Sequence, residues 1–159
     1  MGRAFFFLVL LLFFVTTAEA IDISATGGWG ETIDQADLVS GAGSDLVDTY
    51  ESATDATSID ITNTIDKHDA WRVDVRRVDG GGWHGDFTLY VKRTSDGNGQ
   101  GNVISGGLSY IEITTTDSEF YSGEGALWNV DVQYQLTGMS IGVLPANYST
   151  TIIFTVVDI

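Results

Sequence analysis

Two tryptophans in glycine-rich segments are the residues of this sequence best suited to contact a ligand. Trp29 lies within Gly-Gly-Trp-Gly at 27–30 and Trp83 within Gly-Trp-His-Gly at 82–85, so both are predicted to lie in loops. An indole ring in a loop either stacks on a sugar ring or covers the end of a sheet. Stacking predicts a small carbohydrate-binding module, whereas covering predicts two residues that stabilise the fold.

Oxygen-bearing side chains alternate with glycine in the segment 96–102, as in the first half of a calcium-binding loop. Asp96, Asn98 and Gln100 would supply ligands, and a glycine occupies the sixth position. The twelfth position, which needs a bidentate acid, is Gly107. We therefore expect a glycine-rich hairpin and no bound cofactor, with loose calcium contact as the alternative.

The acidic residues do not form a recognisable catalytic set. The chain has 22 Asp and Glu residues, and a glycosidase would need two of them about 5 to 10 Å apart. Most of these acids fall at alternate strand positions or in turns, where they keep a surface wet. We expect a protein that is not an enzyme; a secreted hydrolase with unidentified carboxylates is an alternative.

The few basic residues after residue 20 all lie between Lys67 and Arg93. A formal net charge of −15 excludes nucleic acid as a partner, because the two surfaces would repel. If the strands predicted near 71–76 and 87–92 pair as a hairpin, their outward side chains form one basic patch. The patch would contain Arg72, Arg76, Tyr90 and Lys92. It either pairs with neighbouring aspartates or docks on an acidic face of another copy or another protein.

The elements that must position these residues are predicted to be strands. Apolar residues alternate with polar ones from Trp128 to Leu136, which places Trp128 on the core face together with Val130 and Val132. Shorter alternations occur at 59–61, 71–75, 87–91 and 111–113. Segments 21–26 with 32–39, 45–50 and 150–157 complete the set.

Glycine and asparagine clusters between these segments favour tight turns. Many short antiparallel strands without helical periodicity predict an all-β protein, an immunoglobulin-like sandwich of about seven to nine strands. A jelly roll or barrel is the alternative. The chain has no cysteine, so packing and strand pairing must provide its stability.

Residues 1–20 have the pattern of a signal peptide. Arg3 is followed by an apolar run at 4–15, and small residues at 18 and 20 suit a cleavage site after Ala20. The run is shorter than the roughly 20 residues of a membrane-spanning helix, and no later segment could span a membrane. We therefore expect a secreted or cell-surface protein with one domain at 21–159.

The C-terminal segment 144–157 combines a proline turn, Tyr148 and an alternating Thr/Val/Ile strand. In this it resembles the closing strand of bacterial chaperone-usher and spore-coat-U-like fimbrial subunits. The resemblance covers about a tenth of the chain, and it implies a secreted immunoglobulin-like sandwich at a surface. Such a protein would be a structural or interaction protein that assembles with copies of itself or binds another surface protein.

The segment 21–26 is a candidate for strand exchange between copies. Ile21, Ile23 and Ala25 share one face of a predicted strand, and the glycines at 27 and 28 can act as a hinge. Added to an open sheet edge of another copy, this strand would satisfy unpaired backbone groups there. Pairing within the same domain is the competing outcome, because it avoids the entropy of association.

Overall fold

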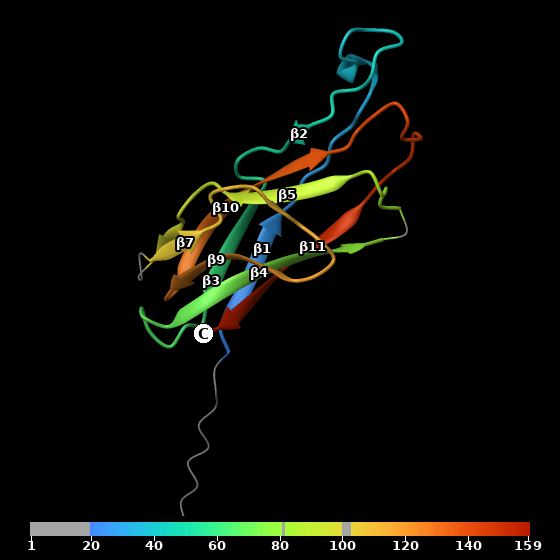
Figure 1. Cartoon of the computed structure of the whole chain (residues 1–159). Coiled ribbons are helices and arrows are strands. Elements are labelled where there is room, and N and C mark those ends of the chain that lie inside the picture. The colour runs from blue at the N-terminus through green and yellow to red at the C-terminus, as the bar shows by residue number, and fades with distance from the viewer. Residues whose placement is uncertain (1–19, 81, 100–102) are drawn as a thin grey trace, which may run out of the picture.

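The computed structural model describes residues 20–80, 82–99 and 103–159, and these form two antiparallel β-sheets packed face to face (Figure 1). Seven strands have six or more residues: β1 (Asp22–Gly27), β3 (Thr57–Thr62), β4 (Ala70–Asp79), β5 (Thr88–Arg93), β9 (Ser118–Glu124), β10 (Leu127–Thr137) and β11 (Thr150–Asp158). Four are shorter: β2 (Tyr50–Glu51), β6 (Asn98–Gly99), β7 (Ile104–Gly106) and β8 (Ile111–Glu112). The predicted all-β sandwich is confirmed.

The larger sheet has the strand order β1-β3-β10-β5-β8, with β2 and β6 also paired to β10. The smaller sheet has the order β11-β4-β9-β7. Across the described residues the two sheets do not close into a barrel. The edge strands β1 and β11 lie on the same side of the sandwich, where they contact each other (Figure 1).

The core lies between the sheets and is built from alternate residues of both. Val73 and Val75 of β4, Val91 of β5 and Val130 and Val132 of β10 are fully buried. These positions follow the period of two that the sequence shows, so each strand presents one face to the core and one to solvent. Trp71 of β4, in the smaller sheet, is also fully buried in this core.

Trp71 explains a glycine in the opposite strand. Its Nε1 donates a 2.8 Å hydrogen bond to the carbonyl of Gly125, and its ring packs edge-on against Tyr121 at 5.9 Å. A Cβ at Gly123 would lie 2.6 Å from the Trp71 ring, closer than any side chain can approach. The bare backbone at Gly123 is therefore what lets a tryptophan fill this part of the core.

The predicted pairing of the strands near 75 and 89 is wrong. β4 pairs with β11 and β9, whereas β5 pairs with β10 and β8, so the glycine-rich segment after Asp79 connects the two sheets. A crossover of this kind is typical of sandwiches, and local turn residues do not distinguish it from a hairpin.

Trp128 also differs from its prediction, because the strand changes phase after Leu127. The pairing register with β3 shifts between Leu127 and Val130, and Asn129 adopts a left-handed φ of 57°. The shift is a β-bulge, in which β10 has one extra residue. Side chains before the bulge therefore point to the opposite face of the sheet from the one that the alternation after it predicts. Leu127 is consequently buried, and Trp128 is 37% exposed.

Residues 32–39 are predicted as part of a first strand. They instead begin a long connection, residues 32–49, that projects from one end of the sandwich and is called the arm below (Figure 1). A 3₁₀ helix at Gln35–Asp37 is capped by Asp34, whose carboxylate accepts from the amide of Ala36. A single bridge joins Leu38 to Leu46. Aspartates at the ends of a short helical turn satisfy its free amides, which overrides the weak strand pattern.

Candidate functional site

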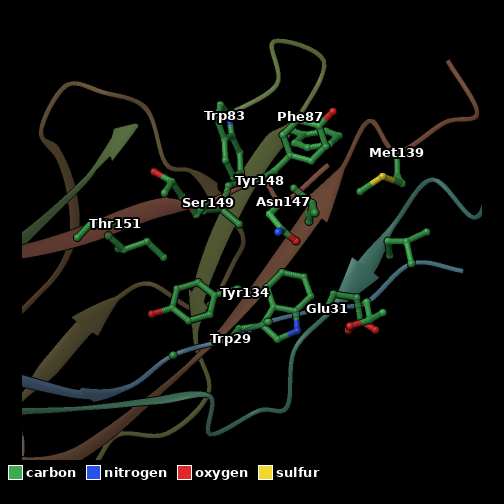
Figure 2. A pocket seen from close by; sticks show the side chains of 18 of the residues that line it. Trp29, Glu31, Trp83, Phe87, Tyr134, Met139, Asn147, Tyr148, Ser149 and Thr151 are labelled. Carbon is green, nitrogen blue, oxygen red and sulfur yellow. The ribbon is translucent and has the colours of Figure 1, made fainter. Parts of the chain in front are cut away.

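A pocket of about 830 Å³ opens between the two sheets where β1 ends and β11 begins (Figure 2). Its floor consists of inward side chains from both sheets, including Leu89, Leu136, Ile152 and Phe154. Its rim consists of the loops that follow β1, β4 and β10. The predicted ligand residues Trp29 and Trp83, which are far apart in the sequence, both line this pocket.

Aromatic side chains form one wall of the pocket. The ring of Phe87 packs edge-on against Trp83 at 5.6 Å and against Tyr148 at 5.0 Å. His84 contacts Phe87 and Tyr148 at 5.3 and 5.7 Å between ring centroids. The Tyr148 hydroxyl donates a 2.6 Å hydrogen bond to the Leu144 carbonyl, which holds the Tyr148 side chain against its own loop.

Trp83 is held in place by more than aromatic contacts. The guanidinium of Arg77 lies 4.9 Å from its ring centroid, a cation–π geometry that occupies one face of the indole. Its Nε1 is buried and has no hydrogen-bond partner within the described part of the chain. Buried indole N–H groups are normally satisfied, so this donor is available to a water molecule or a ligand.

Trp29 lies on the other side of the pocket, next to Tyr134 in the view of Figure 2. It is half-buried against the core. A Cβ added at Gly28 or at Gly30 would meet nothing within 4 Å, so the backbone just before and just after Trp29 is not packed against other atoms on that side. The Tyr134 hydroxyl bonds Thr57 at 2.9 Å and is not free for a ligand.

Glu31 is the one charged side chain among the described residues that line the pocket. Asn147, Ser149 and Thr151 add uncharged polar groups. The rim thus combines hydrogen-bonding groups with apolar rings. A glycosidase would need a second carboxylate across the pocket, and this lining offers Glu31 alone.

A carboxylate of the arm fixes the loop that forms the pocket rim. Asp45 accepts a 2.9 Å hydrogen bond from the backbone amide of Ile141 and a 2.8 Å bond from that of Leu46. These two bonds stabilise the charged form and lower the pKa of Asp45. The arm therefore holds residues 138–149 beside the pocket.

The predicted basic patch is wrong, because its members lie on opposite outer faces of the sandwich. Arg72 and Arg76 project from β4 in the smaller sheet, and Tyr90 and Lys92 project from β5 in the larger one. Within the smaller sheet the arginines pair with aspartates. Arg72 makes two hydrogen bonds of 2.7 and 2.9 Å to Asp74, and Arg76 lies 3.3 Å from Asp117.

On the larger sheet, Lys92 joins a network with neighbouring strands. Its ammonium lies 4.4 Å from the ring centroid of Tyr110, whose hydroxyl donates a 3.0 Å hydrogen bond to Glu51. Burial, reinforced by this bond to Glu51, raises the pKa of Tyr110 to about 12. Tyr90 is paired across the strands with Glu112 and Gln135. These contacts serve the sheet itself.

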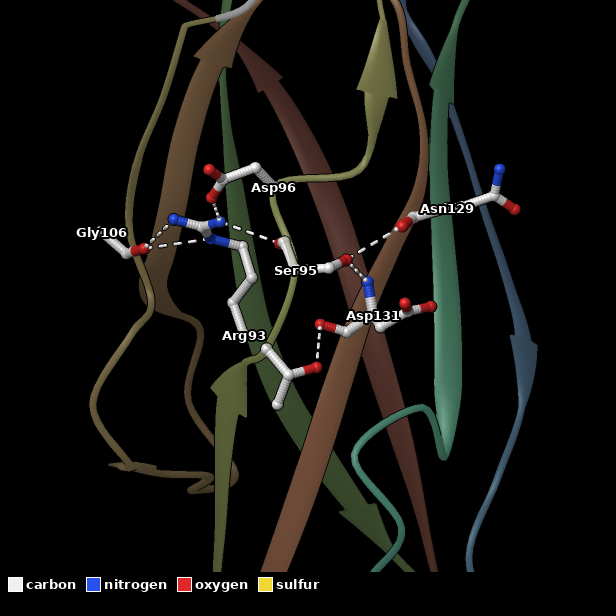
Figure 3. Close-up of polar contacts among 7 residues, drawn as sticks. Arg93, Ser95, Asp96, Gly106, Asn129 and Asp131 are labelled. Atoms are coloured by element: carbon white, nitrogen blue, oxygen red, sulfur yellow. Dashed lines mark hydrogen bonds and ion pairs between the residues drawn. The ribbon is translucent and has the colours of Figure 1, made fainter.

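The calcium candidate has a different role in the structure. Arg93 binds the carboxylate of Asp96 and also donates to the carbonyls of Ser95 and Gly106 (Figure 3). A guanidinium beside the first proposed ligand disfavours a divalent cation there. Asn98 pairs with Trp128 in a short strand, and Gln100 lies outside the described residues. Among the described residues, no three His, Cys, Asp or Glu side chains are grouped to hold a metal.

The candidate exchange segment is paired within its own chain. All six residues of β1 are in register with β3, from Asp22 opposite Thr62 to Gly27 opposite Thr57. Ile21 and Ile23 pack against the core, and Ala25 lines the pocket. Exchange of this strand between copies stays a prediction.

No protein-family model, curated protein or solved structure matches this chain. None of the described segments forms an apolar helix of membrane-spanning length.

Sequence reasoning found the two tryptophans of the pocket but not its other walls. The alternation at 87–91 predicts Phe87 as a core residue of a strand. No motif around Glu31 predicts that it lines a pocket. The loop at 138–149 supplies much of the rim, yet its composition resembles that of any polar connection. A sequence gives no local sign that two distant loops meet at one end of a sandwich.

Proposed function

We propose that the protein is a secreted or cell-surface structural subunit that associates with other copies of itself through the free edge of β11. The observation that carries this proposal is the nature of that edge. β11 has nine residues. β1 of the other sheet contacts it, but within the described part of the chain no strand is hydrogen-bonded to its far side. Unpaired N–H and C=O groups along such an edge are a template for another strand.

The other sheet edges offer fewer residues for pairing than β11 does. At the opposite side of the sandwich, β8 has two residues and β7 has three. β1 has six residues, begins with Asp22 and ends at Gly27. Short edge strands, charges and glycine are common means by which proteins avoid edge-to-edge pairing. Among the described edge strands, β11 therefore offers the longest edge for pairing.

The sequence of β11 also favours association. Residues 150–157 carry no charge in a chain with a net charge of −15, and Asp158 follows them. Ile153 and Val157 are partly exposed on the outer face, while Ile152, Phe154 and Val156 are only partly covered on the inner face. A strand from a second copy would cover these side chains and pair the backbone. Elsewhere the acidic surfaces of two copies repel, which restricts contact to this edge.

A lysine placed on the edge tests the proposal. Thr155 is exposed and lies opposite Asp74 in the register with β4, so Thr155→Lys introduces a charge that the fold can accommodate. We expect the mature protein to form dimers or longer assemblies at high concentration. Light scattering after size-exclusion chromatography should show that Thr155→Lys shifts this population to the monomer.

Thr115→Lys is the matched control, because Thr115 is exposed outside the strands and gains the same charge. This variant should assemble as the unmodified protein does. Negative-stain microscopy of the same samples distinguishes a discrete dimer from a fibre. A mature protein that stays monomeric at high concentration, or an assembly that Thr155→Lys leaves intact, would contradict the proposal.

A further inference from the structure

We propose that the pocket between β1 and β11 binds a neutral hexopyranose unit of a glycan, with Trp29 as the stacking surface. This inference goes beyond self-association and does not depend on it. It assigns the pocket a ligand class and separates the roles of the two tryptophans that line it.

The chemistry of the lining fits a sugar ring. A pyranose has apolar C–H faces, which pack on an aromatic ring, and hydroxyls around its rim, which need hydrogen-bond partners. The pocket provides ring faces together with the carboxylate of Glu31, the amide of Asn147 and hydroxyls at 149 and 151 (Figure 2). An alkyl chain would leave these polar groups unpaired when it displaced their water. The volume of about 830 Å³ accommodates at least one sugar ring.

Trp29 is better placed to stack than Trp83. Arg77 already occupies one face of Trp83 at 4.9 Å, and Phe87 packs on the same indole at 5.6 Å. No aromatic or cationic partner of this kind occurs at Trp29 among the described residues, and this ring is half-buried, so part of it remains exposed at the pocket. Trp83 is therefore a wall of the pocket, and Trp29 provides the ring face.

The charges select the class of sugar. Arg77 and His84 contact the aromatic wall but do not line the pocket, whereas the negative Glu31 does. A uronic acid or a sialic acid would therefore enter without a compensating cation and against the net charge of −15. Neutral sugars avoid both costs, so we expect discrimination in their favour.

The test is a titration of tryptophan fluorescence with soluble oligosaccharides. The probes are neutral glucose, mannose and galactose oligomers, with galacturonate oligomers as the anionic comparison. At least one neutral oligomer should give a saturable change, and galacturonate should not. Trp29→Ala should weaken that binding at least tenfold, because it removes the ring face on which the sugar packs. Binding of the variant is measured by calorimetry, which does not depend on its remaining tryptophans.

Trp128→Ala is the matched control. Trp128 is 37% exposed and does not line the pocket, so its loss should leave affinity unchanged. Trp83→Ala should lower thermal stability, because it removes the contacts with Arg77 and Phe87. Trp29→Ala should still self-associate and Thr155→Lys should still bind sugar, which separates failure of this inference from failure of the proposed assembly.

Three results would overturn the inference. The first is no saturable response to any neutral oligomer. The second is equal affinity for galacturonate. The third is that a peptide with the sequence of residues 150–158 occupies the pocket in place of sugar, as shown by a fluorescence change that Trp29→Ala abolishes; the groove would then be a peptide site.

Discussion

Arg93 shows how a single charge is accommodated inside this sandwich. Its side chain is 2% exposed, and it donates hydrogen bonds to the carbonyls of Ser95 and Gly106 and to the carboxylate of Asp96 (Figure 3). The loops that follow β5 and β7 are thereby held together. Thr94 and Ser95 extend the network to Asp131 and Asn129 of β10. Backbone carbonyls that depend on a guanidinium become unsatisfied when it is removed.

Arg93→Met is therefore expected to lower the free energy of unfolding by about 1–3 kcal/mol, since it leaves the partly buried carbonyls of Ser95 and Gly106 without a donor. Arg76→Met removes an ion pair whose members are 32% and 54% exposed, and it should cost less than about 1 kcal/mol. Denaturant unfolding of the two variants measures the difference. Equal losses would contradict the structural role assigned to Arg93.

At the scale of elements, the strands follow from the sequence wherever the pattern has one phase. β3, β4 and β5 bury every second residue, as their alternation predicts. β10 departs from its pattern at Asn129, where a left-handed residue inserts a bulge and exposes Trp128. β9 has no clear alternation because Gly123 and paired aromatics occupy its core positions. Tertiary contacts determine these elements, so local residues could not reveal them.

β1 provides the prediction at this scale. Deleting residues 21–26 removes all but one of the β1 residues that pair with β3, as well as the partial cover of the core by Ile21 and Ile23. We expect the truncated protein to unfold at a clearly lower temperature as a monomer, measured by circular dichroism. The strand-exchange alternative predicts instead a truncated protein that keeps its melting temperature but no longer associates.

At the scale of the whole molecule, composition and periodicity were sufficient to predict an all-β sandwich but not the order of its strands. The segment after Asp79 has the composition of a hairpin turn, yet it connects β4 to a strand of the other sheet. A hairpin of β4 and β5 is also the premise of the predicted basic patch, whose members lie in different sheets. The pocket was beyond prediction for the same reason, since Trp29 and Trp83 meet only when the sheets are stacked.

At this scale we predict that the chain is exported from the cell and cleaved. The arrangement of Arg3, the apolar run and the small residues before Ile21 predicts cleavage after Ala20. N-terminal sequencing of protein recovered outside the producing cells should begin at Ile21. Recovery of a chain that still begins at Met1 would favour a retained N-terminal anchor.

The pairing of β11 with β4 has a consequence for how quickly this protein reaches its native state. The register joins Trp71 to Asp158 and Asp79 to Thr150, so the smaller sheet cannot be completed by neighbouring segments. Loop closure over such a span must precede the contacts that compensate for it, and sandwiches of this topology fold in about milliseconds to seconds. During that interval the uncharged segment 150–157 has no partner. The repulsion between chains of net charge −15 then keeps folding intermediates apart. The acidity of the surface thus protects the chain before its sheets exist.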